Sequence, residues 1–135
     1  MKRYLSVALM ALFLAGCAHT STLSWEPPVP GQKSSEGNPV VWNMSAENNG
    51  MFLFYYFPIW SGHPTSPNRF DYKLCQNKLT RANMRRLLEC KLEPLKADRV
   101  EDVKITESSS GMAGLWIIWK RSVRGEGVAV KVKKP

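Results

Sequence analysis

The expected fold depends most on one apolar, aromatic-rich stretch: Met51-Phe52-Leu53-Phe54-Tyr55-Tyr56-Phe57-Pro58-Ile59-Trp60. A strand with one wet face alternates apolar and polar side chains, whereas this stretch is apolar on both alternating faces. Two interpretations follow. Either the stretch is a central strand that is covered on both faces, or an aromatic face around Tyr56, Pro58 and Trp60 stays exposed for a partner or ligand.

Runs rich in β-branched and aromatic residues predict five strands around this stretch. The expected strands are Val40–Met44, Met51–Phe57, Val100–Thr106, Leu115–Ser122 and Gly127–Lys133. Glu47–Gly50 has the composition of a hairpin loop, since Asn and Gly tolerate positive φ. Arg124–Gly127 is expected to turn the chain between the last two strands, and Ser108–Gly111 to form a looser connection.

One helix is expected between the second and third strands. Thr80 is a suitable N-cap, the helix should run to about Lys91 or Leu92, and Pro94 marks its end. The order of elements predicts an α+β fold, in which a small antiparallel sheet of about five strands carries one helix on one face.

Basic side chains gather on this helix and on the segment before it. The cluster consists of Arg69, Lys73, Lys78, Arg81, Arg85 and Arg86. Such a surface is expected to meet an anionic partner, such as lipid phosphates, an acidic glycan or another envelope protein. A solvated helix face is the alternative.

The first residues have the parts of an export signal: Lys2 and Arg3, then an apolar run from Leu5 to Leu14. The run is too short to span a bilayer, which takes about 20 apolar residues. Leu14-Ala15-Gly16-Cys17 resembles the lipobox of bacterial lipoprotein signal peptides. The resemblance covers only the export segment and implies a lipid anchor, not an activity.

The resemblance implies cleavage before Cys17, a diacylglyceryl group on the Cys17 thiol and an acylated amino terminus. Removal of residues 1–16 takes two positive charges from the formal +8 and leaves a mature chain of charge +6. Ala18 is not the Asp that enteric lipoproteins use for inner-membrane retention. We therefore expect lipid anchoring in the outer membrane, with the domain facing the periplasm.

Residues 17–38 are expected to form the lipidated start and a flexible tether rich in Pro, Ser and Gly, before a domain at residues 39–135. About 20 flexible residues have a typical reach of roughly 25 Å. Trp25 is the exception within the tether, with a place at the membrane interface, on the domain or in solvent.

Cys75 and Cys90 remain once Cys17 carries lipid. Export to an oxidising compartment favours a Cys75–Cys90 disulfide, with two separate thiols as the alternative. No metal site is expected, because these cysteines with His19 and His63 do not make a four-ligand set.

The sequence contains no constellation for nucleophilic catalysis and no phosphate-binding glycine loop, so we expect no enzyme and no cofactor. His63 is expected to form hydrogen bonds within its loop. Export separates the chain from cytoplasmic nucleic acid, and none is expected as a partner. The expected function is a binding or accessory module. The alternatives are a structural subunit that uses an aromatic sheet face, and a small hydrolase or a lysis- or toxin-related factor.

Overall fold

The computed structural model describes residues 20–67, 71–112 and 115–132. In these residues, six strands form one antiparallel sheet and one helix packs on it. The elements are β1 (Ser21–Glu26), β2 (Val40–Leu53), β3 (Phe57–Gly62), β4 (Tyr72–Leu74), α2 (Arg81–Glu89), β5 (Arg99–Met112) and β6 (Leu115–Val130). The expected α+β class is thus confirmed, with six strands in place of about five.

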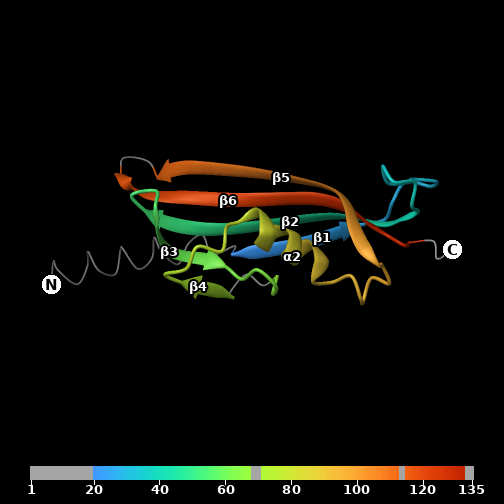
Figure 1. The fold of residues 1–135 in the computed structure, drawn as a ribbon. Helices are drawn as coiled ribbons and strands as arrows, with labels where there is room; N and C mark the ends of the chain where they lie inside the picture. Colours follow the sequence, from blue (N-terminus) through green and yellow to red (C-terminus); the bar gives the residue numbers. More distant parts are fainter. Residues whose placement is uncertain (1–19, 68–70, 113–114, 133–135) are drawn as a thin grey trace.

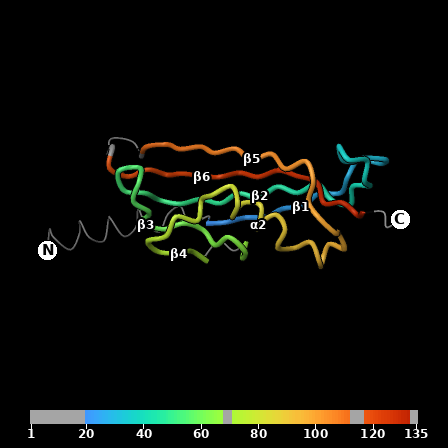
Figure 2. The backbone as a smooth tube through the Cα atoms, viewed as in Figure 1, coloured from blue at the N-terminus to red at the C-terminus, as the bar shows by residue number. Residues whose placement is uncertain are grey.

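The sheet is long because three of its strands are long. The strand order is β4-β3-β2-β6-β5, and β2, β6 and β5 run side by side along the molecule (Figures 1 and 2). The other edge of β2 is shared by two short strands, with β1 beside residues 43–48 and β3 beside residues 50–53. The result is an elongated domain with two distinct ends.

Three predicted turns are wrong. Glu47–Gly50 lies inside β2, Arg124–Gly127 inside β6 and Ser108–Gly111 inside β5. The last two expected strands therefore belong to one strand, β6, and β2 runs through the first expected turn to Leu53. β5 and β6 are separate strands, and Ser108–Gly111 is an extension of β5. Gly125 shows why a glycine stands in a strand here. A Cβ at this position would lie 2.6 Å from Cγ of Met84, so the glycine makes room for the helix and does not turn the chain.

Helix α2 begins as expected at Thr80, whose side chain accepts a hydrogen bond from the backbone N of Asn83 at 3.2 Å. It ends at Glu89, two residues before the earlier of the two expected ends. Met84, Leu87 and Leu88 follow the i, i+3, i+4 spacing of one helix face and are buried against the sheet.

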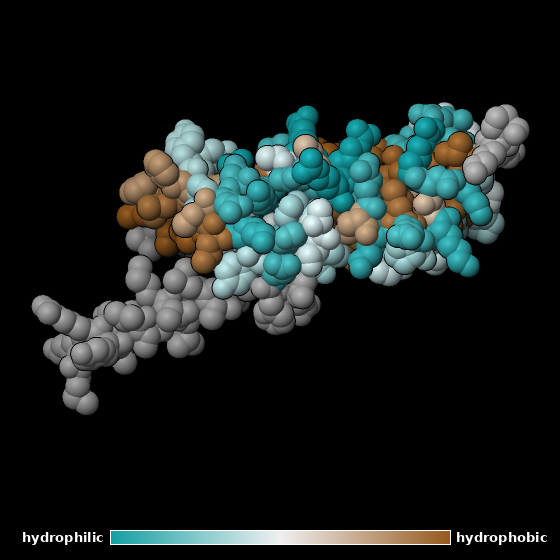
Figure 3. Space-filling model, turned by 60° about the horizontal axis from the view of Figure 1, so that its bottom comes forward, coloured by the Kyte–Doolittle hydropathy of each residue, from teal (hydrophilic) through white to brown (hydrophobic). Residues whose placement is uncertain are grey.

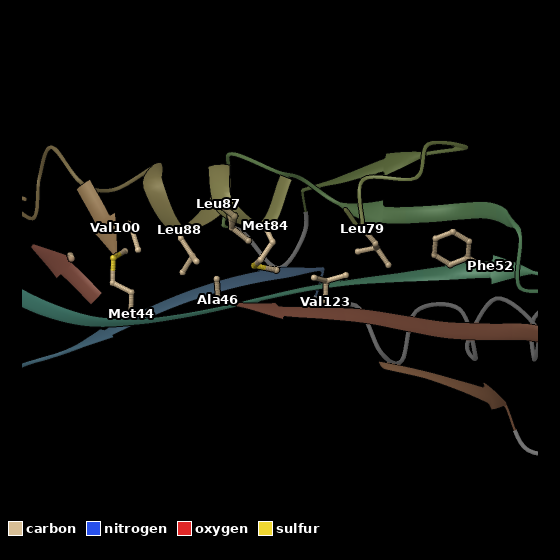
Figure 4. Close-up of a cluster of buried hydrophobic side chains, with 10 residues drawn as sticks. Met44, Ala46, Phe52, Leu79, Met84, Leu87, Leu88, Val100 and Val123 are labelled. Atoms are coloured by element: carbon tan, nitrogen blue, oxygen red, sulfur yellow. The ribbon is translucent and has the colours of Figure 1, made fainter. Parts of the chain in front are cut away.

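The core lies between α2 and the sheet. The helix side chains share one cluster of buried residues with Met44, Ala46 and Phe52 of β2, Val123 of β6 and Val100 of β5 (Figure 4). Leu87 and Leu88 are fully buried. Full burial of such a side chain contributes roughly 1.5–3 kcal/mol, so this one face fixes the helix on the sheet.

The segment expected to be a flexible tether belongs to the fold from residue 20 onward. β1 pairs with β2 from Ser21 opposite Asn48 to Glu26 opposite Asn43. The loop that follows is held to β5: Asn38 donates to the carboxylate of Glu101 at 2.8 Å, and Ser35 bonds to Asp102. The tether prediction is therefore wrong for residues 20–38, and the sheet takes up this part of the chain.

Candidate functional site

An aromatic turn stands at one end of the elongated sheet, where the chain passes from β2 to β3. The exposed fractions are 54% for Phe54, 76% for Tyr56 and 65% for Phe57, while Tyr55 is partly buried. Ile117 at the start of β6 is 43% exposed, and its carbonyl accepts a hydrogen bond from the Phe54 amide at 2.6 Å. We call these five residues the aromatic tip, and hydrophobic surface gathers at this end of the domain (Figure 3).

The backbone of the tip is strained. Phe54 has a φ of 49° and Tyr55 a φ of 70°, in the left-handed region. Each such residue costs roughly 1–2 kcal/mol unless it is Gly or Asn, which tight turns normally use. Strain of this kind concentrates where a side chain is needed for function, so two adjacent aromatic residues at this turn mark it as a candidate site.

Tyr55 organises the rings behind the turn. Its ring lies edge-on to Tyr56 at 5.3 Å between centroids and edge-on to Trp119 at 5.4 Å. The guanidinium of Arg121 lies 4.8 Å from the Phe52 ring centroid and 5.0 Å from that of Tyr55. These edge-to-face and cation–π contacts hold the tip in one arrangement before any partner binds.

The two interpretations of the apolar stretch can now be compared. The covered central strand is correct for Met51 and Phe52, which are buried in β2 between β3 and β6. It is wrong for the rest of the stretch, because β2 ends at Leu53 and the chain then turns back. The exposed aromatic face exists, but it is centred nearer the turn than expected. Tyr56 belongs to it, whereas Pro58 and Trp60 are partly buried in β3.

Ion pairs neutralise part of the predicted basic cluster. Arg81 pairs with Glu107 at 3.2 Å, and Arg85 pairs with Glu89 at 3.7 Å. These contacts are exposed and contribute little to stability, but they neutralise two of the three arginines of α2. A solvated face therefore accounts for Arg81 and Arg85.

The other basic residues lie in two places. Lys73 is opposite Ser61 in the β3–β4 register, and the Lys78 amide donates to the Ser61 hydroxyl at 3.0 Å, so their backbones are close. Arg86 is exposed in the last turn of α2. Arg69 lies outside the described residues, as does Cys17.

Cys75 and Cys90 are free thiols, so the expected disulfide is absent. The Cys75 amide bonds to Ile59 of β3, whereas Cys90 follows the far end of α2. The nine-residue helix between the two cysteines is about 13 Å long. The Cα atoms of a disulfide lie within about 7 Å of each other, so the length of this helix works against a Cys75–Cys90 bridge. Burial raises the pKa of the Cys90 thiol, which donates to the Leu87 carbonyl at 3.0 Å.

His63 lies in the connection after β3, where its Nδ1 accepts a hydrogen bond from the Thr65 amide at 3.2 Å. This contact fits the expected role within the loop. In the described part of the chain, no three His, Cys, Asp or Glu side chains are placed to hold a metal ion.

Carboxylates at the end opposite the aromatic tip fasten the β1–β2 loop. The pKa of Glu101 is lowered chiefly by a hydrogen bond from Ser34, with further contributions from Arg99 and Asn38. The pKa of Asp102 is lowered by hydrogen bonds from Ser35. Both carboxylates stay ionised at neutral pH and serve as loop anchors.

A shallow groove of about 460 Å³ crosses β1, β2, β6 and β5. It is lined by Lys104 and Arg124 together with Glu26, Asp102 and Glu126. Arg124 pairs with Glu126 at 3.2 Å, and Asp102 bonds to Ser35. The mixed and partly paired charges give the groove no preference for one ligand class.

No protein-family model, curated protein or solved structure matches the chain. Within residues 20–67, 71–112 and 115–132, no helix has the length and apolar character needed to cross a bilayer.

Proposed function

We propose that this chain is an envelope lipoprotein, anchored through lipid on Cys17 and placed in the outer membrane on the periplasmic side, whose α+β domain is a binding or accessory module. The observation that carries the proposal is the lipobox Leu14-Ala15-Gly16-Cys17 standing directly before the fold. Cleavage before Cys17 removes no residue of any described element, because β1 begins at Ser21.

The start of the fold supports an anchor close to the domain. Thr20 is 1% exposed, and its carbonyl accepts a hydrogen bond from the Asn49 amide at 2.7 Å. Only Ala18 and His19 separate Cys17 from this docked residue. Three residues span at most about 11 Å, so a lipid on Cys17 holds the domain at the membrane surface.

The described surfaces fit binding better than catalysis. Two of the arginines on α2 are neutralised by ion pairs, and the groove across the sheet has mixed charge. The aromatic tip is exposed, and ring contacts hold it in place. Exposed aromatic clusters with fixed geometry are typical of interaction sites. An envelope protein or an anionic lipid or glycan is the proposed kind of partner.

Intact mass spectrometry of the protein from membranes of its native host tests the anchor. The expected mass is that of the chain from Cys17 with acyl groups added, and Cys17→Ser should abolish acylation. Cys75→Ser is the matched control, since the free Cys75 thiol should have no part in anchoring. An uncleaved chain without acyl groups would refute the proposal.

The second candidate is a structural subunit of an envelope complex, in which the aromatic tip is buried against a protein. The exposure of Phe54, Tyr56 and Phe57 is the observation that favours it. Cross-linking at position 56 in native membranes, followed by mass spectrometry, should then give one protein adduct in place of lipid adducts.

A further inference from the structure

We infer that the aromatic tip inserts into the headgroup region of an anionic bilayer, so that the domain stands on the membrane with its strands pointing away from it. This inference rests on the proposed lipid anchor, and it adds a second, non-covalent membrane contact at a defined surface. The partner is the boundary between lipid headgroups and acyl chains.

The anchor and the tip lie at the same end of the sheet. β1 is antiparallel to β2, so its first residue, Ser21, lies opposite Asn48 and its last near the start of β2. Thr20 is hydrogen-bonded at Asn49, four residues before Leu53. Four strand residues measure about 13 Å, and the three residues back to Cys17 reach at most about 11 Å.

These two lengths match closely. A lipid on Cys17 sits at the headgroup boundary, and the aromatic turn lies about as far from Thr20 as the anchor can reach. The opposite end, with the exposed Val29 in the β1–β2 loop, lies too far away for the same anchor. The covalent geometry therefore brings the tip, and not the loop, to the bilayer.

The chemistry of the tip suits that depth. Tyr and Trp concentrate at membrane interfaces because their rings prefer an apolar layer while their polar atoms remain hydrated. Phe54, Tyr56 and Phe57 project from a turn, so they can enter without exposing the paired edge of a strand to lipid. Phe54 and Tyr55 occupy strained backbone positions at which Asn or Gly would relieve the strain.

The charge near the tip complements an anionic surface. Residues 50–60 and 117–121 contain no Asp or Glu, whereas Lys120 and Arg121 directly follow Trp119. Lys120 is exposed, and Arg121 lies against the Phe52 and Tyr55 rings. Basic residues just behind interfacial aromatics attract anionic lipids, and salt weakens this attraction.

The test uses the acylated full-length mature protein, reconstituted in vesicles that contain phosphatidylglycerol. An environment-sensitive dye is attached through Tyr56→Cys, in a chain that also carries Cys75→Ser and Cys90→Ser. Val29→Cys in the same background is the matched control, because Val29 is 69% and Tyr56 76% exposed at opposite ends of the sheet. Acyl mass and vesicle flotation are recorded for both proteins.

We expect the dye at position 56 to shift its emission to the blue and to be quenched by lipids with a quencher near the headgroup, while the dye at position 29 does neither. Adding Phe54→Ser and Phe57→Ser should reduce the quenching at position 56. Equal, water-like emission at both positions in a protein that floats with the vesicles would overturn the inference and leave the lipid anchor intact. A blue shift without lipid quenching would assign the tip to a protein contact and also overturn it. Loss of acylation and flotation would instead refute the proposed function.

Discussion

Gly62→Ala should destabilise the domain by separating the start of the fold from the sheet. A Cβ at Gly62 would collide with the side-chain oxygen of Asn48 and with the carbonyl of Thr20, whose carbon would lie only 2.6 Å away. Two of the three colliding atoms belong to the backbone, so no rotamer change relieves the overlap. Thr20 must move away from β3.

The magnitude follows from what Thr20 loses. Overpacking in a closed interior costs typically 1–3 kcal/mol. The Thr20 carbonyl also accepts the Asn49 amide at 2.7 Å, and a buried amide left without its partner costs about 1–3 kcal/mol. Together these effects remove about 2–6 kcal/mol, a large share of the roughly 5–15 kcal/mol that stabilises a domain.

Urea unfolding followed by tryptophan fluorescence measures this loss, with Cys17→Ser in every chain so that none carries lipid. With a slope of about 1–3 kcal/mol per molar urea, the midpoint should fall by roughly 1–2 M or more. Gly111→Ala is the control: its Cβ would lie 3.8 Å from the Trp119 ring, so its midpoint should stay close to that of the parent. If Gly62→Ala unfolds at the same urea concentration as the control, then Thr20 does not pack at Gly62, and the short path from anchor to sheet is refuted.

Three further predictions concern the rest of the domain. Both Cys75 and Cys90 should be alkylated without prior reduction, Cys75 quickly and Cys90 slowly, because Cys90 is half-buried and its pKa is raised. The lowered pKa of Glu101 should make stability fall as pH drops below about 4.3, the ordinary Glu value, and through the lower folded value; Glu101→Gln should flatten this acid branch of urea midpoint against pH. Leu87→Ala should lower the free energy of unfolding in urea by about 2–5 kcal/mol, since Leu87 is fully buried between α2 and the sheet.

Clear results would contradict each of these. Alkylation of the two cysteines only after reduction would show that they form a disulfide. An acid branch that is unchanged in Glu101→Gln would remove the carboxylate from the loop contact. A Leu87→Ala midpoint within error of the parent would place α2 off the sheet.

The sequence predicted the helix and the fold class because those signals are local. Thr80 caps the first turn through its own side chain, and Met84, Leu87 and Leu88 have helical spacing. The single amphipathic face then left a sheet as its packing partner. These features depend on neighbours within one or two turns, so the sequence contains them directly.

The lengths of the strands were not predictable in the same way. Asn48 and Gly125 are residue types typical of turns, yet each is required in a strand by a distant contact. Asn48 donates to the Gly62 carbonyl at 3.3 Å, and Gly125 makes room for Met84. Tertiary packing therefore overrode local turn preference. β1 was missed although Leu23 and Trp25 alternate with polar residues, because the prolines that follow suggested a tether.

The candidate site was predictable in part. The apolar stretch suggested an exposed aromatic face, but aromatic residues rarely occupy a turn with positive φ, so the reversal at Phe54 and Tyr55 had no local signal. The basic cluster stays a prediction as a binding surface; its members Arg81, Arg85 and Arg86 are exposed on α2. Its partial neutralisation depended on Glu107, which lies 26 residues from Arg81 in sequence and reaches it only through the packing of α2 on β5.

With the proposed anchor and tip insertion, the sheet would replace the flexible tether as the spacer between membrane and partner. β2 has 14 residues, so it measures about 45 Å from the aromatic tip to the loop at residues 27–39. That loop is fixed by the Arg99–Glu36 ion pair and by the hydrogen bond from Asn38 to Glu101. With the tip in the headgroups, the loop stands at a defined height above the bilayer. A rigid spacer keeps its far end at that distance at all times, whereas a flexible tether of roughly 25 Å reach would spread the domain over a volume and lower its concentration at any one height. An envelope partner positioned at that height would therefore meet the loop without the entropic cost of ordering a tether.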